Sequence, residues 1–143
     1  MIVLLDASPL GRITNPIAST INKECYQWME SLILKGVQVF VPEISDYEIR
    51  RELLRANKKQ GIVRLDILKN SIGYLPITTA IMLKAAELWA QARRTGKPTA
   101  DPKALDCDVI LAAQALEIGA IIATENIGHL SQFVEAKHWR AIT

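Results

Sequence analysis

Cysteine is scarce in this chain: Cys25 and Cys107 are its only two among 143 residues. They do not form a CxxC spacing, and no pair of histidines lies near either of them. The sequence therefore indicates neither a zinc site nor a disulfide framework. Cys107 could act as a reactive thiol beside Asp108, but we favour the commoner role of a small buried side chain.

The chain also lacks a long apolar run and an N-terminal targeting segment. No stretch approaches the ~18 apolar residues of a membrane span. Asp6 interrupts the first apolar run, 2–5, and no basic residue precedes that run, so a signal peptide is not indicated. We therefore expect a soluble, cytoplasmic protein with no membrane partner.

Two phosphate-binding motifs and a strong excess of charge are missing as well. The chain contains neither GxGxxG nor a GxxxxGK run ending in Ser or Thr, which removes the main sequence grounds for a nucleotide-binding enzyme. Its formal net charge is only +2, so strong nonspecific binding to DNA is not implied.

Apolar sequence, by contrast, is plentiful enough for one core. Half of the residues, 50%, are hydrophobic. A chain of this size can bury roughly 70% of the surface that it exposes when unfolded. We expect residues 1–143 to form a single globular domain.

Short apolar runs alternate with longer segments of helical period. The runs are continuous rather than alternating, which is typical of parallel strands covered on both faces. Strands are predicted at 2–5, 37–41, 74–77 and 121–123, with a weaker one at 139–142. Helices are predicted at 19–35, 43–59, 62–70, 78–93 and 106–117, with an exposed loop at 95–103. The pattern predicts an α/β domain of three layers, with a central parallel sheet of four to five strands.

Acidic side chains stand where the predicted strands end. Asp6 follows the first strand and Glu48 lies early in the helix after the second. Asp108 lies in the first turn of the predicted helix 106–117, next to Asp106. The carboxyl ends of parallel strands share one edge of a sheet, and like charges there repel unless a cation lies between them. The sequence thus indicates a metal-dependent active site.

Each acid also has a purely structural alternative. An Asp after a strand is commonly a turn former or helix cap, so Asp6 could simply cap the next segment. The helix dipole favours acids at a helix start, which would explain Asp106 and Asp108. For Asp106 we favour this structural role over metal ligation. The joint placement of Asp6, Glu48 and Asp108 favours catalysis.

The chain resembles a known family in four segments that occur in register over its full length. They are 2–10 (IVLLDASPL), 41–51 (VPEISDYEIRR), 108–115 (DVILAAQA) and 123–126 (ATEN). In this order they resemble the PIN domain family and are similar to the VapC-type toxin ribonucleases. The resemblance implies Mg²⁺- or Mn²⁺-dependent hydrolysis of RNA, a cognate antitoxin and a homodimer.

By matching position, Asp6, Glu48 and Asp108 carry over from the family as the acidic catalytic and metal-binding residues. The family's fourth acid falls near Asn126, which offers an oxygen but no negative charge, so Glu125 could compensate. Because Mg²⁺ usually keeps several waters, we expect Asp6 and Asp108 to be the main ligands. Glu48 would then hold a metal-bound water or act as the base.

Substrate contacts are predicted from neighbouring polar and basic residues. Ser8 and Thr124 could hydrogen-bond the substrate phosphate or merely cap the backbone. A basic segment supplies Arg50, Arg51, Arg55, Lys58, Lys59 and Arg64. Arg51 and Arg55 share one helical face that could neutralise RNA phosphates, although a solvated charged helix is the alternative.

The sequence also permits two other functions. A PIN-like module weakened by the missing acid near Asn126 would bind nucleic acid or a partner without cleaving RNA. A phosphoacceptor receiver domain has a similar layered fold, but it requires a second acid beside Asp6 and an acceptor Asp where this chain has Pro76-Ile77-Thr78.

The apolar helical segments 19–35 and 43–70 could form a groove for a partner.

Overall fold

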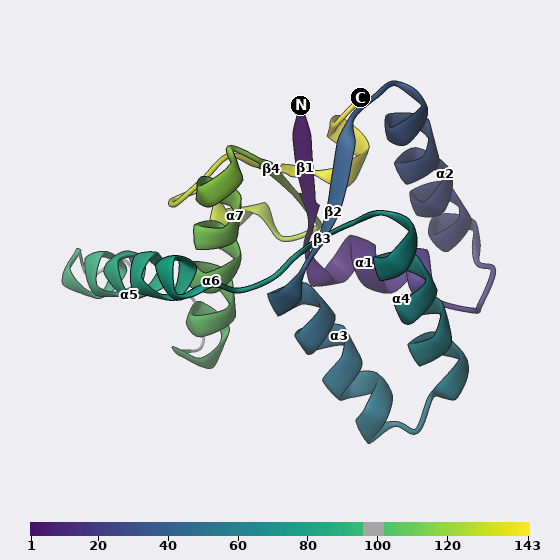
Figure 1. Cartoon of the computed structure of the whole chain (residues 1–143), viewed down its shortest axis with the longest axis horizontal. Coiled ribbons are helices and arrows are strands. Elements are labelled where there is room, and N and C mark those ends of the chain that lie inside the picture. The colour runs from purple at the N-terminus through teal and green to yellow at the C-terminus, as the bar shows by residue number, and fades with distance from the viewer. Residues whose placement is uncertain (96–101) are drawn as a thin grey trace.

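A parallel β-sheet forms the centre of the molecule (Figure 1). The computed structural model describes the backbone of residues 1–95 and 102–143 and the side chains of 1–95 and 105–143. The sheet has five strands in the order β3-β2-β1-β4-β5, all parallel. They are β1 (Ile2–Leu5), β2 (Gln38–Pro42), β3 (Gly73–Leu75), β4 (Ile121–Thr124) and β5 (Ala136–His138). The predicted α/β fold with a central parallel sheet is confirmed.

Helices cover both faces of this sheet. On one side lie α1 (Ala7–Thr14), α2 (Thr20–Leu34), α3 (Glu43–Arg55) and α4 (Lys59–Ser71), and on the other α5 (Thr79–Arg94), α6 (Pro102–Ile118) and α7 (Ile127–Leu130) (Figure 1). The 3₁₀ turn η1 (Trp139–Ala141) follows β5. Of the helices in the described ranges, none combines the length and apolar character needed to cross a membrane.

The central strand β1 shows why its sequence is apolar throughout. Val3 and Leu5 are fully buried against Met29 and Leu32 of α2, together with Leu65 of α4. Leu4, between them, faces the opposite layer and packs with Leu111 of α6 and with Ile122 of β4. Because successive side chains point to opposite faces, a strand covered on both sides is hydrophobic at every position.

The helix after β2 is shorter than the predicted range 43–59. Asn57 has φ +53°, a left-handed conformation that Asn tolerates better than most residues. The Asn57 N–H donates to Leu54 O at 3.1 Å and the Lys58 N–H to Leu53 O at 2.8 Å. These two bonds are the paired C-terminal bonds of a Schellman motif. They end α3 at Arg55 and let α4 start in a new direction at Lys59.

The predicted start of the helix at 106 is wrong. α6 begins at Pro102, so Asp106 and Asp108 lie beyond its first turn and are not N-terminal dipole residues. Proline suits the first helical position because the N–H that it lacks would have no helical partner there. Of the loop predicted at 95–103, residues 96–101 lie outside the described residues and the last two belong to α6.

The last predicted strand is also wrong, because residues 139–142 do not continue the sheet. β5 comes earlier, at Ala136–His138, and Trp139–Ala141 form a 3₁₀ turn. Trp139 and Ile142 are both buried, with 1% and 3% of their surfaces exposed. Residues three apart share a face in a 3₁₀ turn but lie on opposite faces of a strand. Burying both side chains in one core therefore favours the turn.

Candidate active site

Three acidic side chains approach one another at the edge of the sheet where the strands end. Asp6 directly follows β1, and Glu48 lies in the second turn of α3, which starts where β2 stops. Asp108 lies in the second turn of α6. Each charge is close enough to disturb another: Asp6 and Asp108 both raise the pKa of Glu48, and Asp6 raises that of Asp108. The structure therefore brings the predicted acids together.

Burial is the larger cause of these shifts. It raises the pKa of Glu48, and with the repulsion from Asp6 and Asp108 the value reaches about 7. Burial and the charge of Asp6 together raise the pKa of Asp108 to about 6. Burial also raises the pKa of Asp6, although hydrogen bonds from Thr124 and the Ala7 N–H oppose it. The site holds carboxyl groups that are costly to ionise near neutral pH.

Little positive charge of the protein offsets this cluster. Arg51 lowers the pKa of Glu48, and His129 of α7 lowers that of Asp108. Within the described side chains, no lysine or arginine forms an ion pair with Asp6, Glu48 or Asp108. The sequence offered one signal for His129: it lies just after β4, at the same sheet edge as the acids.

The donor set suits a hard divalent cation. Among residues whose side chains are described, no three His, Cys, Asp or Glu residues lie close enough to ligate one ion directly. Mg²⁺ does not need three such ligands, because one or two carboxylates with several waters and a phosphate complete its octahedron. Asp6 and Asp108 fit that requirement, and a cation between them would relieve their repulsion.

Asp6 has both a structural and a site role. Its Oδ1 accepts a 2.7 Å hydrogen bond from the Ala7 N–H, so Asp6 is the N-cap of α1. Its Oδ2 accepts a 2.7 Å bond from the Thr124 hydroxyl at the end of β4. The helix-cap alternative is thus present, and the same contacts orient the carboxylate at the sheet edge.

Thr124 and Ser8 have protein partners at this edge. The fully buried Thr124 hydroxyl also accepts a 2.9 Å bond from the Asn126 N–H, so it is satisfied as both donor and acceptor. Ser8 Oγ accepts a 3.0 Å bond from the Glu125 N–H. These bonds join α1 to the segment after β4 and favour the backbone-capping alternative for both hydroxyls.

Asn126 and Glu125 do not restore a fourth acid. Asn126 is exposed and makes no side-chain capping bond to α7. Glu125 Oε1 accepts bonds from Arg12 Nε at 2.7 Å and from Trp139 Nε1 at 3.3 Å. Burial would raise the pKa of Glu125, but these hydrogen bonds and the charges of Arg12 and His138 together outweigh it and lower the pKa. Glu125 is a structural carboxylate held in an ion pair.

Asp106 and Cys107 lie beside the site without joining the acid cluster. Asp106 is exposed on α6. Cys107 is partly buried, and burial, followed by the charge of Glu48, raises its pKa to about 11. Because the thiolate is the nucleophilic form, a raised pKa disfavours a nucleophilic role for this thiol at neutral pH, and the role of a small, partly buried side chain is the better description.

The structure divides the basic segment into two groups. Arg50 donates to Asp46 at 2.9 Å and to Asp66 at 2.7 Å, joining α3 to α4. Arg64 Nε donates to Thr14 O, at the C-terminal end of α1. Both guanidinium groups have structural partners. The other basic residues of the segment are Arg51, Arg55, Lys58 and Lys59, and all four are exposed. Arg55 pairs with Glu52 of its own helix at 2.8 Å, and Arg51 lies over the ring of Tyr47.

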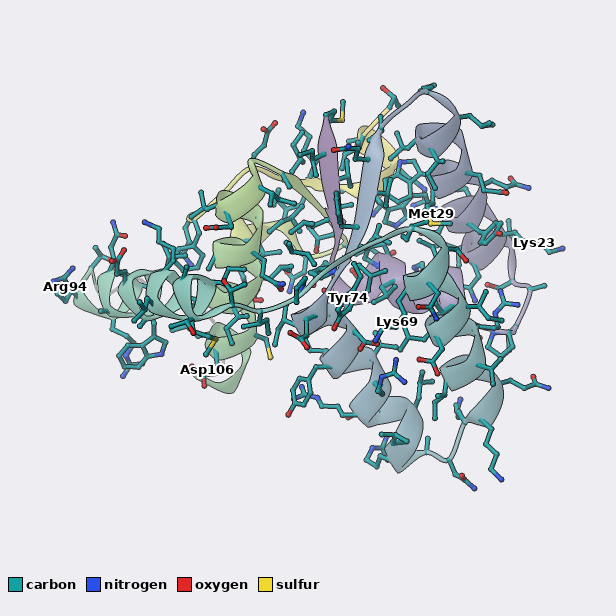
Figure 2. All side chains as sticks on the ribbon, viewed as in Figure 1. Lys23, Met29, Lys69, Tyr74, Arg94 and Asp106 are labelled. Carbon is teal, nitrogen blue, oxygen red and sulfur yellow. The ribbon has the colours of Figure 1, made fainter. Side chains whose placement is uncertain are left out.

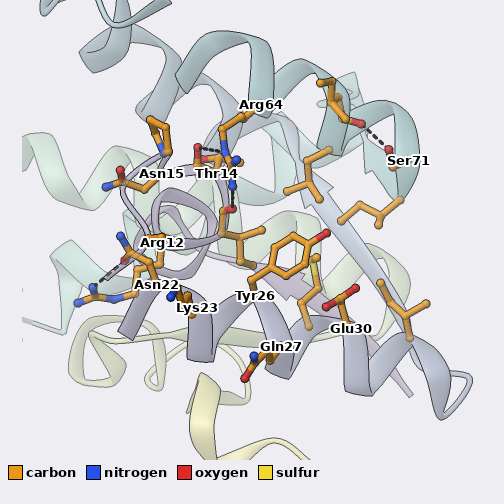
Figure 3. A pocket seen from close by; sticks show the side chains of 18 of the residues that line it. Arg12, Thr14, Asn15, Asn22, Lys23, Tyr26, Gln27, Glu30, Arg64 and Ser71 are labelled. Carbon is orange, nitrogen blue, oxygen red and sulfur yellow. Dashed lines mark hydrogen bonds between the residues drawn. The ribbon is translucent and has the colours of Figure 1, made fainter. Parts of the chain in front are cut away.

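Two hollows lie on the surface next to α1. The larger has a volume of about 810 Å³ and lies between α2 and α4, lined by exposed apolar residues that include Ile17, Ile33 and Ile67 (Figure 3). The smaller has a volume of about 670 Å³ and lies between α1, the second half of α3 and the start of α4. Ser8 and Glu125 line the smaller hollow, so it borders the acidic edge.

Solved structures share this fold. One similar chain belongs to VapBC2 from Rickettsia felis, bound to a DNA fragment from their promoter, with TM-score 0.79, 18% identity, and coverage of 97% of this chain and 99% of that one. FitAcB from Neisseria gonorrhoeae gives TM-score 0.74, 22% identity and coverage of 98% and 99%. VapBC-1 from nontypeable Haemophilus influenzae gives TM-score 0.65, 15% identity, and coverage of 98% of this chain and 99% of that one. At these identities the likeness establishes the fold alone.

Sequence comparison identifies the family. No match is found among curated protein sequences. The family model described as the PIN domain matches residues 3–132, nearly the whole chain, and the match spans Asp6, Glu48, Asp108 and Thr124. The chain therefore belongs to the PIN domain family.

Proposed function

We propose that this PIN domain is a divalent-metal-dependent endoribonuclease and the VapC-like toxin of a toxin–antitoxin pair. The observation that carries the proposal is the cluster of the partly buried carboxyl groups Asp6, Glu48 and Asp108. Besides burial, the charge of Asp6 raises the pKa of Glu48 and of Asp108, and the charge of Asp108 raises that of Glu48. Ionisable groups with shifted pKa values cluster at functional sites, because catalysis uses the shifted pKa.

Mg²⁺ or Mn²⁺ is the cofactor that this donor set suits. Asp6 and Asp108 would hold the ion, with water and a substrate phosphate as further ligands. When bound, such an ion polarises the phosphoryl oxygen and lowers the pKa of water. The Thr124 hydroxyl, 2.7 Å from Asp6 Oδ2, keeps this carboxylate oriented for the task.

Glu48 is the residue that we assign as general base. In the metal-free protein its pKa is about 7. A cation held by Asp6 and Asp108 would favour its ionised form, which can accept a proton near neutral pH. It would take the proton of the water whose oxygen forms the new bond to phosphorus. The bond from phosphorus to the leaving ribose oxygen breaks, and that oxygen takes up a proton from solvent water. Arg51 lies close enough to lower the pKa of Glu48, and we assign Arg51 and Arg55 to RNA phosphates.

Cleavage of a labelled RNA, with Mn²⁺ or with EDTA, tests the assignment. The wild-type protein should cleave only with the ion, and Asp6→Asn should lower the rate by about 100-fold or more, because a ligand and a negative charge are lost. The matched control is Glu117→Gln, which removes an exposed acid at the far end of α6. Unchanged turnover in Asp6→Asn would reject Asp6 as a catalytic residue.

The alternative is a PIN domain that binds nucleic acid without cleaving it. Asn126 supplies no charge at the fourth acidic position, and Glu125 is engaged with Arg12, which is the observation that favours this alternative. Retained RNA affinity with no Mn²⁺-stimulated cleavage by the wild-type protein would establish it.

We infer that the antitoxin binds the apolar groove between α2 and α4. Ile17, Ile33, Leu34 and Ile67 line it and are between 42% and 88% exposed, so the groove offers an unpartnered apolar surface (Figure 3). An amphipathic helix in such a groove is a common mode of peptide recognition. The similar solved chains come from VapBC and FitAB complexes.

A further inference from the structure

The smaller hollow, of about 670 Å³, begins where the acidic edge ends. Ser8, on its lining, lies two residues after Asp6 on α1. Glu52, also on the lining, lies one turn after Glu48 on the same face of α3. A polymer bound across the acids would therefore continue over this hollow.

One wall of the hollow is apolar and is shaped by close helix contacts. Ile49 and Leu53 of α3 line it, and Gly11 and Gly61 lie opposite them on α1 and α4. A Cβ at Gly11 would lie 3.2 Å from Ile49 Cδ1, and one at Gly61 would lie 2.8 Å from Leu53 Cδ2. The two glycines thus let α1 and α4 close around α3 and leave a surface of aliphatic carbon.

The rim of the hollow carries surplus positive charge. Its two carboxylates already have arginine partners: Glu125 pairs with Arg12 at 2.7 Å and Glu52 with Arg55 at 2.8 Å. Lys58 and Lys59 also line the hollow. Over the described part of the chain, neither lysine forms an ion pair with a carboxylate. The lysines can therefore accept a phosphate without displacing a partner.

We propose that this hollow is a subsite for one nucleotide of the RNA, next to the phosphate that is cleaved. Lys58 and Lys59 bind its phosphate, and its base lies against Ile49 and Leu53. The volume lies in the usual range of small-molecule sites, roughly 300–1,000 Å³. This inference rests on the proposed nuclease function for the direction of the RNA, but binding at the subsite needs no metal ion.

Binding of a fluorescein-labelled ten-nucleotide RNA in EDTA, followed by anisotropy, tests the subsite without cleavage. Lys58→Glu/Lys59→Glu should raise the Kd about tenfold or more and flatten its dependence on salt, because phosphate contacts release counterions. The matched control is Lys35→Glu/Lys84→Glu, which makes the same change of charge just after α2 and on α5, outside the hollow. Equal weakening by both pairs would overturn the proposal.

A second variant tests the space in the hollow separately from the charge of its rim. Ala56→Leu narrows the hollow at an exposed lining position and keeps both lysines. It should weaken RNA binding several-fold, whereas unchanged binding would show that no nucleotide enters. An acidic peptide is the alternative occupant of the hollow, and octaglutamate tests it by competition with the RNA. If Lys58→Glu/Lys59→Glu no longer binds the peptide but still binds RNA, the nucleotide assignment is wrong.

Failure of the nuclease proposal gives a different result from failure of the subsite. If the wild-type protein never cleaves RNA but the lysine and Ala56 variants lose binding, the subsite is supported and the nuclease is not. If the protein cleaves RNA with Mn²⁺ while these variants bind RNA like the wild type, the subsite is rejected and the nuclease is supported.

Discussion

At the scale of single residues, the acids of the sheet edge weaken the fold when they ionise. Burial and neighbouring charge raise the pKa of Glu48 from 4.5 to about 7 and that of Asp108 from 3.8 to about 6. A raised carboxyl pKa means that the folded state holds the proton more tightly than the unfolded state. The resulting stability is fully present below the unfolded pKa and is lost as pH rises through the folded pKa.

Glu48→Gln should therefore stabilise the metal-free protein at pH 7.5. The Gln side chain never ionises, so the variant avoids a cost of about 1–2 kcal/mol, after allowance for solvent screening of a partly exposed group. The gain over the wild type should grow between about pH 4.5 and about pH 7 and be small below that window. Urea unfolding in EDTA at several pH values measures it.

Two comparisons make this result specific to the acid cluster. Glu117→Gln, at an exposed position on α6, should show no such growth with pH. Adding Mn²⁺ at pH 7.5 should stabilise the wild type more than Glu48→Gln, because a cation relieves the repulsion that the variant has already lost. If Glu48→Gln is less stable than the wild type at pH 7.5, the acids do not repel one another as described.

At the scale of elements, an ion-pair network links α3 to α4. Arg50 bridges Asp46 of its own helix and Asp66 of α4, and Lys69 Nζ lies 3.5 Å from Asp46 Oδ2. Lys69 also lies over the ring of Tyr74, 4.5 Å from its centroid (Figure 2). Asp46 and Arg50 lie two residues before and two residues after Glu48 on α3. The network therefore holds the helix that presents the proposed base.

Breaking this network should loosen α3. Arg50→Met should lower the free energy of unfolding by about 1–3 kcal/mol, because Asp46, with 9% of its side chain exposed, loses its main partner. Arg55→Met, in the same helix, breaks the exposed pair with Glu52 and should cost less than about 0.5 kcal/mol. Chemical denaturation compares the two. Equal losses would show that the network adds nothing beyond a surface pair.

At the scale of the whole molecule, three surfaces are candidates for partner contacts. Two of them adjoin, because the apolar groove and the smaller hollow share lining residues, which are Arg12, Thr14, Asn15, Pro16, Ile17 and Asn22. The acidic edge and its hollow face the ends of the strands, and the apolar groove lies between α2 and α4. On the other side of the sheet, α5 exposes Met82, Leu83 and Trp89. Such unpartnered apolar side chains favour the homodimer that the family resemblance implies.

Light scattering of the purified chain should give twice the 15.9 kDa mass of one copy. Under the toxin proposal, adding the cognate antitoxin should raise this mass, because the antitoxin would occupy the groove. Ile67→Glu, which charges the groove, should abolish the increase and keep the dimer. Val63→Glu, on the exposed outer side of the same helix, is the matched control and should keep both. Loss of the partner in both variants would contradict the groove assignment.

Much of the architecture could be predicted from local chemistry. Continuous apolar runs predicted the strands because both faces of the sheet are covered. Asp6 at the end of β1 indicated the sheet edge at which the three acids lie. The errors arose where one backbone conformation or one burial decided the outcome. Asn57 in the left-handed region ended α3, and Trp139 with Ile142 turned the last segment into a 3₁₀ turn.

The sequence by itself determined the order of apolar and acidic segments, and with it the α/β class and the PIN family. Only the tertiary structure decided which charged groups remain available. Sequence spacing does not reveal that Arg12 engages Glu125, or that Asp46 and Asp66 engage Arg50. The reason is physical: ionisation and pairing depend on burial and on distances between side chains far apart in the chain, and these exist only after the helices pack.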